Sequence, residues 1–256
     1  MTIQTIKTTP YTDQRPGTSG LRKSVKQFKK PDYLQNFIQA IFNTLEDIKG
    51  STLILGGDGR YFNREAIQII LRMAAAAGAS RIIIGQSGIL STPAASNLIR
   101  KYKALGGIIL SASHNAGGPE GDFGVKFNVS NGGPAPESIT EAIFAASKTI
   151  QEYHITGLSP IPIDKLGRYD LFGMQVDVID AVSDYLELME SIFDFDKLAA
   201  LLQSDKFKMH FDAMHAVTGP YARRILQERL GAPEGTVING QPLADFGGGH
   251  PDPNQV

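Results

Sequence analysis

Gly107-Ile108-Ile109-Leu110-Ser111-Ala112-Ser113-His114-Asn115-Ala116-Gly117-Gly118 is the stretch that decides the expected fold. Its apolar beginning indicates a buried strand, and its hydroxyl- and glycine-rich remainder indicates a loop. Open α/β sheets bind ligands at the carboxyl ends of their strands. The loop is therefore expected to lie at a ligand site, although an ordinary glycine-rich connection would have the same composition.

On both sides of this stretch, short apolar runs alternate with segments whose apolar residues recur at the spacing of a helix. This alternation predicts an α/β fold with a mixed, mostly parallel sheet that is covered by helices on both faces. Val125 to Asn128 lies only a loop away from residues 108–110, so we expect those two runs to pair antiparallel. Asp32 and Asn63 are expected to cap helices. Residues 151–172, rich in glycine and proline, are expected to form a long irregular connection. The other expected strands are 3–7, 52–55, 81–84 and 174–179, and the other expected helices begin near 92, 137 and 181.

A second unit is expected to begin near Phe193. A helix is predicted at 194–202, a strand at 206–212 and another helix from 218 to Gly231. These elements make one βα step and the start of another, which is too little for a complete domain. The predicted organisation is therefore a first domain over 1–192, followed by an incomplete second α/β domain over 193–256.

Composition excludes several classes of function. The 25 basic residues nearly balance the 26 acidic ones, which argues against a broad nucleic-acid or acidic-membrane surface. There is no cysteine, so disulfides, thiolate catalysis and thiolate metal sites are impossible. No run approaches the roughly 20 apolar residues of a membrane helix, and the N-terminus does not resemble a signal peptide. We expect a cytoplasmic protein with no membrane or nucleic-acid partner.

The serine loop offers chemistry for phosphoryl transfer. The hydroxyl of Ser113 could carry a phosphoryl group, and the backbone N–H groups of Gly117 and Gly118 could approach its oxygens. His114 and Lys126 add protons or positive charge nearby, although each could equally be an ordinary loop or surface residue. A zinc site built from His210, Asp212 and His215 is a weaker hypothesis, because His215 is expected in a turn.

Residues 111–128 resemble the active-serine loop of the α-D-phosphohexomutases, and within that family the loop of the phosphoglucomutases. The family pattern is Thr/Ser-Ala-Ser-His-Asn-Pro-Gly-Gly, followed by Gly-Asp-Phe-Gly-Ile/Val-Lys. Ala116 departs from it by replacing proline, and we expect this change to loosen the loop. Four other segments, three before the loop and one after it, also resemble the family and occur in the family's order: Pro16 to Arg22, Gly56 to Arg60, Gly88 to Pro93, and Asp245 to Asn254.

The resemblance implies an enzyme that interconverts glucose 1-phosphate and glucose 6-phosphate through a phosphoserine and glucose 1,6-bisphosphate. Carried over, Ser113 is the phosphorylated residue, binds substrate, and helps to bind Mg²⁺ through its phosphate. Lys126 matches a residue implicated in proton transfer, His114 belongs to the catalytic loop, and Arg22 matches a contact to the substrate phosphate. The implied partner is a phosphohexose.

Three further motifs of the family are not found in this sequence: the aspartate-rich metal loop, the sugar-recognition loop and the C-terminal phosphate loop. We therefore expect the chain to be an N-terminal portion that lacks C-terminal domains and is inactive alone. Phosphomannomutase activity is one alternative, since the sugar loop would distinguish the two sugars. A truncated, non-catalytic paralogue that binds a phosphosugar or a protein partner is the other.

Overall fold

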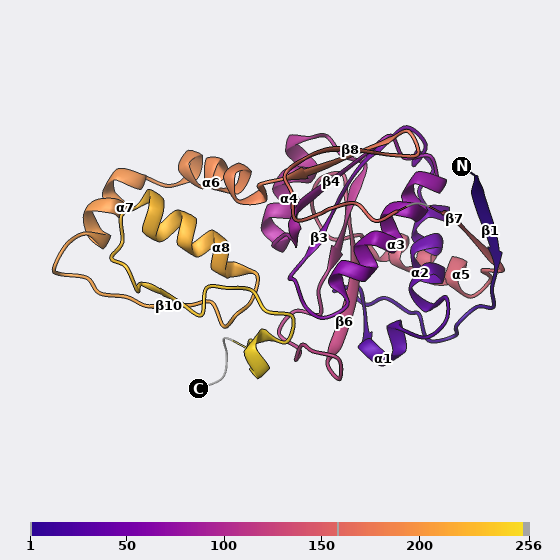
Figure 1. Ribbon diagram of the computed structural model, residues 1–256, viewed down its shortest axis with the longest axis horizontal. Coiled ribbons are helices and arrows are strands. Elements are labelled where there is room, and N and C mark those ends of the chain that lie inside the picture. The colour runs from indigo at the N-terminus through magenta and orange to yellow at the C-terminus, as the bar shows by residue number, and fades with distance from the viewer. Residues whose placement is uncertain (1, 158, 253–256) are drawn as a thin grey trace.

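The computed structural model describes residues 2–157 and 159–252. A large sheet with its helices forms one part of the molecule, and a smaller unit extends from one side of it (Figure 1). That unit contains α7 (Phe195–Leu202), β10 (Phe211–Asp212) and α8 (Thr218–Ala222). Pro253 and Asn254, which end the last of the similar segments, lie outside the described residues.

A seven-stranded mixed sheet forms the centre of the larger part. Its four central strands are parallel to one another, whereas the other three strands, toward the two edges, pair antiparallel. The predicted mixed sheet is confirmed, and so is the antiparallel pairing of Val125 to Asn128 with the strand before it. In spatial order the strands are β2 (Leu21–Ser24), β6 (Asp122–Val129), β5 (Gly106–Leu110), β3 (Thr52–Gly57), β4 (Arg81–Ile89), β9 (Met174–Ile179) and β8 (Gly167–Leu171).

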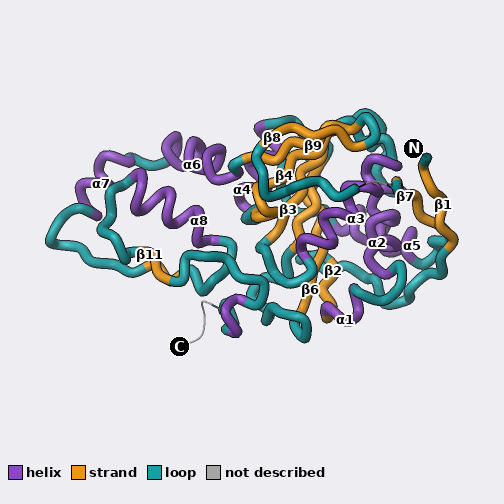
Figure 2. Tube along the Cα trace, in the orientation of Figure 1, coloured by secondary structure: helices purple, strands orange, loops and turns teal. Residues whose placement is uncertain are grey.

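Helices cover both faces of the sheet, as predicted. Alternation along β3 sends Leu53 and Leu55 into one apolar core and Ile54 into the other. Figure 2 shows the strands as a central layer between the two groups of helices. The first core is covered by α2 (Tyr33–Asn43), α3 (Asn63–Ala76) and α5 (Glu137–Ser147), and the second by α4 (Thr92–Lys101) and α6 (Ala181–Ile192). A short helix, α1 (Val25–Phe28), follows β2.

The prediction of an irregular connection over 151–172 was wrong. Residues Glu152–Thr156 form β7, which pairs antiparallel with β1 (Ile3–Lys7) in a separate two-stranded sheet. Residues Gly167–Leu171 form β8, which pairs with β9. The partner of β7 lies about 150 residues earlier in the chain, as the pairing of Ile3 with Thr156 shows. Local composition cannot reveal such a partner, because glycine and proline nearby indicate turns whether or not a strand lies between them.

Two predicted helix caps also differ in the structure. Asp32 precedes α2, but its side chain makes no capping hydrogen bond and instead accepts one of 2.9 Å from the hydroxyl of Tyr153. Asn63 is the first residue of α3 rather than its cap, and its amide donates to the carbonyl of Gly88 at 3.3 Å. In both cases a tertiary partner takes the side chain that would otherwise bond to the helix end.

The smaller unit contains α7 (Phe195–Leu202) and two short parallel strands, β10 (Phe211–Asp212) and β11 (Val237–Ile238). Helix α8 (Thr218–Ala222) continues into a π-helix over Arg223–Arg229. Only the last two residues of the strand predicted over 206–212 are paired. Helix α6 packs on α4 and also lends apolar side chains to the smaller unit, so the division at residue 193 stays a prediction. Among the described residues, no helix has the length and hydropathy to cross a bilayer.

The carboxylate of Asp177 joins the central strands to the edge of the sheet and gives stability a pH dependence. Burial raises its pKa, but hydrogen bonds from Arg81, Arg168 and Gln175 outweigh burial and hold the pKa below its usual value. A lowered pKa in the folded state stabilises the fold above the unfolded value of about 3.9 and loses that contribution as pH falls. We expect Asp177→Asn to flatten the acid limb of stability in urea unfolding at a series of pH values. The same change at the exposed Asp205 should leave that limb unchanged.

Candidate active site

The serine loop, defined as residues 111–121, leaves the carboxyl end of β5 and returns as β6. Ser113 lies at its exposed tip with a φ of 60°. This left-handed conformation is unfavourable for a residue with a side chain, so surrounding contacts must hold it. The structure therefore exposes the hydroxyl of Ser113 to solvent, while contacts with the rest of the protein fix the backbone that carries it.

One of those contacts involves the hydroxyl of Ser111. It donates to Oδ2 of Asp58 at 2.7 Å, and it accepts a hydrogen bond of 3.0 Å from the backbone N–H of Ser113. A serine hydroxyl has a single proton, so this donation leaves its lone pairs for Ser113. The hydroxyl of Ser111 is thus used in hydrogen bonds that hold the loop, whereas the hydroxyl of Ser113 is exposed.

Arg60 holds the same loop from inside the protein. Its side chain is only 1% exposed and pairs with Asp58, with Nε 3.0 Å from both carboxylate oxygens. Its terminal nitrogens donate to the carbonyl oxygens of Ser113 at 2.9 Å, Asp122 at 2.8 Å and Asn115 at 3.3 Å. From the sequence alone, Asp58 and Arg60 could either touch a ligand or stabilise a turn. The hydrogen bonds of Arg60 described above support the structural role.

His114 lies beside the exposed hydroxyl. Its Nδ1 is 3.5 Å from Oγ of Ser113, so the two neighbouring side chains do approach each other. The histidine ring also lies 6.3 Å from the ring of His250, measured between centroids. Both side chains of the Ser113-His114 pair are exposed. The pair can therefore exchange a proton with a bound molecule, although the structure assigns neither residue a role.

Arg22 and Lys126 form a separate group of positive charge on the adjoining strands. Burial, and then the charge of Arg22, lower the pKa of Lys126. The Nε of Arg22 is buried and has no hydrogen-bond partner. Among the described residues, no carboxylate pairs with either cation. Two close positive charges without a counter-ion are an arrangement suited to an anionic ligand.

The strand register relates these cations to the serine loop. Arg22 on β2 lies opposite Gly124 on β6, and the carbonyl of Gly124 accepts a hydrogen bond of 3.0 Å from the N–H of Ser111. Lys126 follows two residues later on the same face of β6. Neither cation contacts Ser113 directly. The structure therefore places Lys126 on β6, the strand that receives the loop, and Arg22 on the neighbouring strand β2.

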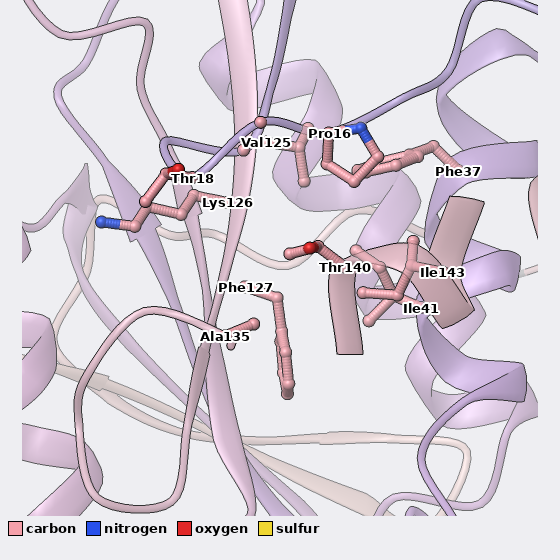
Figure 3. Close-up of a pocket in the computed structure, with 12 residues that line it drawn as sticks. Pro16, Thr18, Phe37, Ile41, Val125, Lys126, Phe127, Ala135, Thr140 and Ile143 are labelled. Atoms are coloured by element: carbon pink, nitrogen blue, oxygen red, sulfur yellow. The ribbon is translucent and has the colours of Figure 1, made fainter. Parts of the chain in front are cut away.

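The segment that carries Arg22 lies over a small, mainly apolar pocket between β6, α2 and α5. Figure 3 shows Phe37, Ile41 and Ile143 on one side of this pocket and the amino group of Lys126 pointing away from them. Gly20, at a φ of 85°, approaches so closely that a Cβ there would lie 2.4 Å from the carbonyl oxygen of Val125. The pocket suits packing of this segment on the sheet rather than a charged ligand.

A wider cleft of about 930 Å³ lies between the serine loop and the smaller unit. One wall carries Ser111, Ser113 and His114, and the opposite wall is mainly apolar, with Met209, Tyr221, Ile225 and Leu226 among its residues. The exposed hydroxyl thus faces a space large enough for a small molecule.

The zinc hypothesis has no support in this geometry. Nδ1 of His210 lies 3.3 Å from the carbonyl oxygen of Gly235, whereas Nδ1 of His215 lies 3.0 Å from that of Gln241. Asp212 accepts hydrogen bonds from the backbone of Met214 and the side chain of Asn239. Within residues 2–157 and 159–252, no three His, Asp or Glu side chains gather closely enough to hold a metal ion.

Replacing Arg60 tests the structural role of the buried pair. We expect Arg60→Met to destabilise the protein by about 3–5 kcal/mol, because it leaves the charge of Asp58 buried without a partner. Combining it with Asp58→Asn should recover part of that loss. The measurement is urea unfolding, with Arg64→Met as the matched control. Arg64 forms an exposed ion pair with Asp164, so its loss should cost less than about 1 kcal/mol. Equal losses for the two arginine variants would contradict the role of Arg60.

The chain is similar to known proteins in both sequence and fold. The sequence profile described as phosphoglucomutase/phosphomannomutase, alpha/beta/alpha domain I, matches residues 13–154. A phosphoglucomutase of Rhizobium radiobacter is 60% identical over 254 residues, which are 99% of this chain and 47% of that protein. Phosphoglucomutase-1 of Oryctolagus cuniculus is 54% identical over 262 residues, covering 98% of this chain and 47% of its own length.

A solved structure shows the same fold. The crystal structure of the exocytosis-sensitive phosphoprotein pp63/parafusin, a phosphoglucomutase from Paramecium in its open form, superposes with a TM-score of 0.95 at 46% identity. That similarity covers 98% of this chain and 48% of the Paramecium chain. The chain thus spans about half the length of the relatives that it matches. Because the family profile covers more than half of the chain, the chain belongs to the phosphoglucomutase/phosphomannomutase family.

Proposed function

We propose that this chain carries the phosphoserine part of a phosphoglucomutase, which interconverts glucose 1-phosphate and glucose 6-phosphate through glucose 1,6-bisphosphate. The observation that carries the proposal is the exposed hydroxyl of Ser113 on an anchored, left-handed loop. Arg22 and Lys126 on the adjoining strands support it, since no described carboxylate pairs with either cation. The names of the two relatives described above point to glucose phosphates, since both are phosphoglucomutases.

The proposed reaction moves one phosphoryl group at a time. The bond between Oγ of phosphorylated Ser113 and phosphorus breaks while a hydroxyl oxygen of the sugar monophosphate forms a new bond to phosphorus. The sugar hydroxyl loses its proton, and Oγ of Ser113 regains one. The bisphosphate then turns around and returns its other phosphoryl group to Ser113 by the same step in reverse. Such transfer depends mainly on positioning and on neutralising the charge of the phosphoryl oxygens.

Lys126 is suited to the proton transfer in this reaction. Burial and the charge of Arg22 lower its pKa, which makes the neutral, proton-accepting form easier to reach than for an ordinary lysine. We assign Arg22 to the phosphate that is not transferred, because its buried Nε has a free donor. His114 is the second candidate for exchanging a proton at Ser113, since its ring nitrogen lies close to the hydroxyl.

The proposal includes Mg²⁺ bound at the phosphate of Ser113. The exposed position of that residue leaves its phosphate accessible to a cation. The described side chains supply no cluster of three acidic or histidine ligands, so a complete coordination sphere cannot be built from them. Bound there, the ion would neutralise charge on the phosphoryl oxygens. A cytoplasmic location, a phosphohexose partner and the roles of Ser113, His114, Lys126 and Arg22 stay predictions.

Phosphate mapping tests the central assignment. The full-length gene product is incubated with glucose 1,6-bisphosphate, and phosphate is located by mass spectrometry. We expect phosphate on Ser113, its loss in Ser113→Ala, and its retention in Ser111→Ala, because the Ser111 hydroxyl is committed to Asp58. Turnover of glucose 1-phosphate should be lost with the same Ser113 variant. Phosphate on Ser111 would overturn the assignment. Faster turnover of mannose 1-phosphate would indicate a phosphomannomutase, and phosphosugar binding without turnover would indicate a non-catalytic protein.

The coupling of Arg22 to Lys126 gives a second test. We expect Arg22→Gln to raise the pKa of Lys126, because a neighbouring positive charge disfavours a second one. The pKa should remain below its ordinary value, since burial is the larger cause. An NMR titration of lysine side-chain carbons, assigned with Lys126→Arg, measures the change. The KM for glucose 1-phosphate should rise in the same variant. An unchanged lysine titration would show that the two cations do not interact.

A further inference from the structure

A segment near the end of the described chain packs against the serine loop. We define residues 242–248 as the bridging segment. The carbonyl oxygen of Ala244 accepts hydrogen bonds from the backbone N–H of Tyr61 at 2.7 Å and from that of Gly118 at 3.2 Å. One oxygen therefore joins the turn after β3 to the serine loop, although more than 120 residues of chain separate it from Gly118.

Phe246 completes this contact with its side chain. The residue is only 3% exposed, and its ring centroid lies 5.2 Å from the guanidinium carbon of Arg60. Close approach is possible because residue 117 is glycine. A Cβ at Gly117 would lie 2.9 Å from the carbonyl oxygen of Ala244 and 2.9 Å from a ring carbon of Phe246. The ring thus covers the arginine whose hydrogen bonds hold the carbonyls of the serine loop.

The other side of the bridging segment is tied to the smaller unit. The backbone N–H of Leu243 donates to the carbonyl oxygen of His215 at 2.9 Å. A Cβ on Gly247 would lie 2.8 Å from the ring of His215, so the segment also packs closely against that side chain. The bridging segment consequently contacts the smaller unit and the serine loop at once.

We propose that the bridging segment positions the serine loop for phosphoryl transfer, with Phe246 as its positioning residue. The catalytic part of this inference rests on the proposed function. Phe246 keeps water from Arg60, and hydrogen bonds in a dry environment are stronger than the same bonds in water. Removing the ring hydrates Arg60 and weakens its hold on Ser113. Positioning errors of about 1 Å can lower a rate by as much as about a hundredfold.

The test compares Phe246→Ala and Phe246→Leu with Leu243→Ala, a change at an exposed side chain of the same segment. All are made in the full-length gene product and studied well below their melting temperatures. Hydrogen exchange is measured by mass spectrometry on peptides covering Tyr61 and Gly118, whose N–H groups bond to Ala244. A peptide covering Leu90, which follows β4 and whose N–H bonds to the carbonyl of Gly57 at the end of β3, reports on the rest of the fold.

We expect faster exchange at Tyr61 and Gly118 in both Phe246 variants, with no change at Leu90 and none in Leu243→Ala. The kcat for glucose 1-phosphate should fall by about 5-fold to 100-fold while KM stays within about twofold. A general loss of stability would instead speed exchange at Leu90 as well. Phe246→Leu removes the ring over Arg60 but keeps an apolar side chain at the buried position, so it serves if Phe246→Ala does not fold.

Unchanged exchange at Tyr61 and Gly118 in folded Phe246 variants would overturn the proposal, as would a rise in KM with an unchanged kcat. Failure of the proposed function has a different signature, which is a wild-type protein without turnover and without phosphate on Ser113. In that case the exchange measurement alone decides whether Phe246 holds the loop. Altered exchange would then support the structural contact, and unaltered exchange would refute it.

Discussion

The buried ion pair between Asp58 and Arg60 is the interaction on which the candidate site depends. A guanidinium that is 1% exposed must have its charge balanced and its N–H groups bonded, and here one carboxylate and three backbone carbonyls do both. The arrangement is possible because β3 and β5 are neighbouring parallel strands, so the turn after one lies beside the loop after the other. The left-handed backbone of Ser113 is held in place by the same set of bonds.

The positive charges of the site divide into two kinds. The charge of Arg60 is neutralised inside the protein by Asp58, so it adds little to the electrostatic attraction of a ligand from solvent. Arg22 and Lys126 have no such partner among the described residues, and their mutual repulsion contributes to the lowered pKa of Lys126. An incoming phosphate would relieve that repulsion. The structure thus separates the cation that builds the loop from the cations available to an anionic ligand.

The smaller unit contributes to the site in two ways. Its apolar residues form the wall of the cleft that faces Ser113, and the segment next to it packs against Gly117 and Gly118 of the serine loop. A change in the position of this unit would therefore alter the shape of the cleft. It would also act on the serine loop directly, through the backbone hydrogen bonds. The contact between this segment and the serine loop depends on Gly117, because any side chain there would displace Ala244 and Phe246.

The sequence by itself determined the alternating α/β organisation, the mixed sheet and the position of Ser113 at a strand end. Those features depend on local periodicity and on glycine, which a single chain displays directly. It did not reveal β7, whose partner β1 lies at the other end of the domain, or the tertiary roles of Asp32 and Asn63. It also left open whether Asp58 and Arg60 touch a ligand or stabilise a turn. It gave no sign that Phe246 packs against the serine loop. Only the tertiary structure decided these points, because each depends on which distant segments meet, and hydrogen bonds and buried charges select partners by proximity in space rather than in sequence.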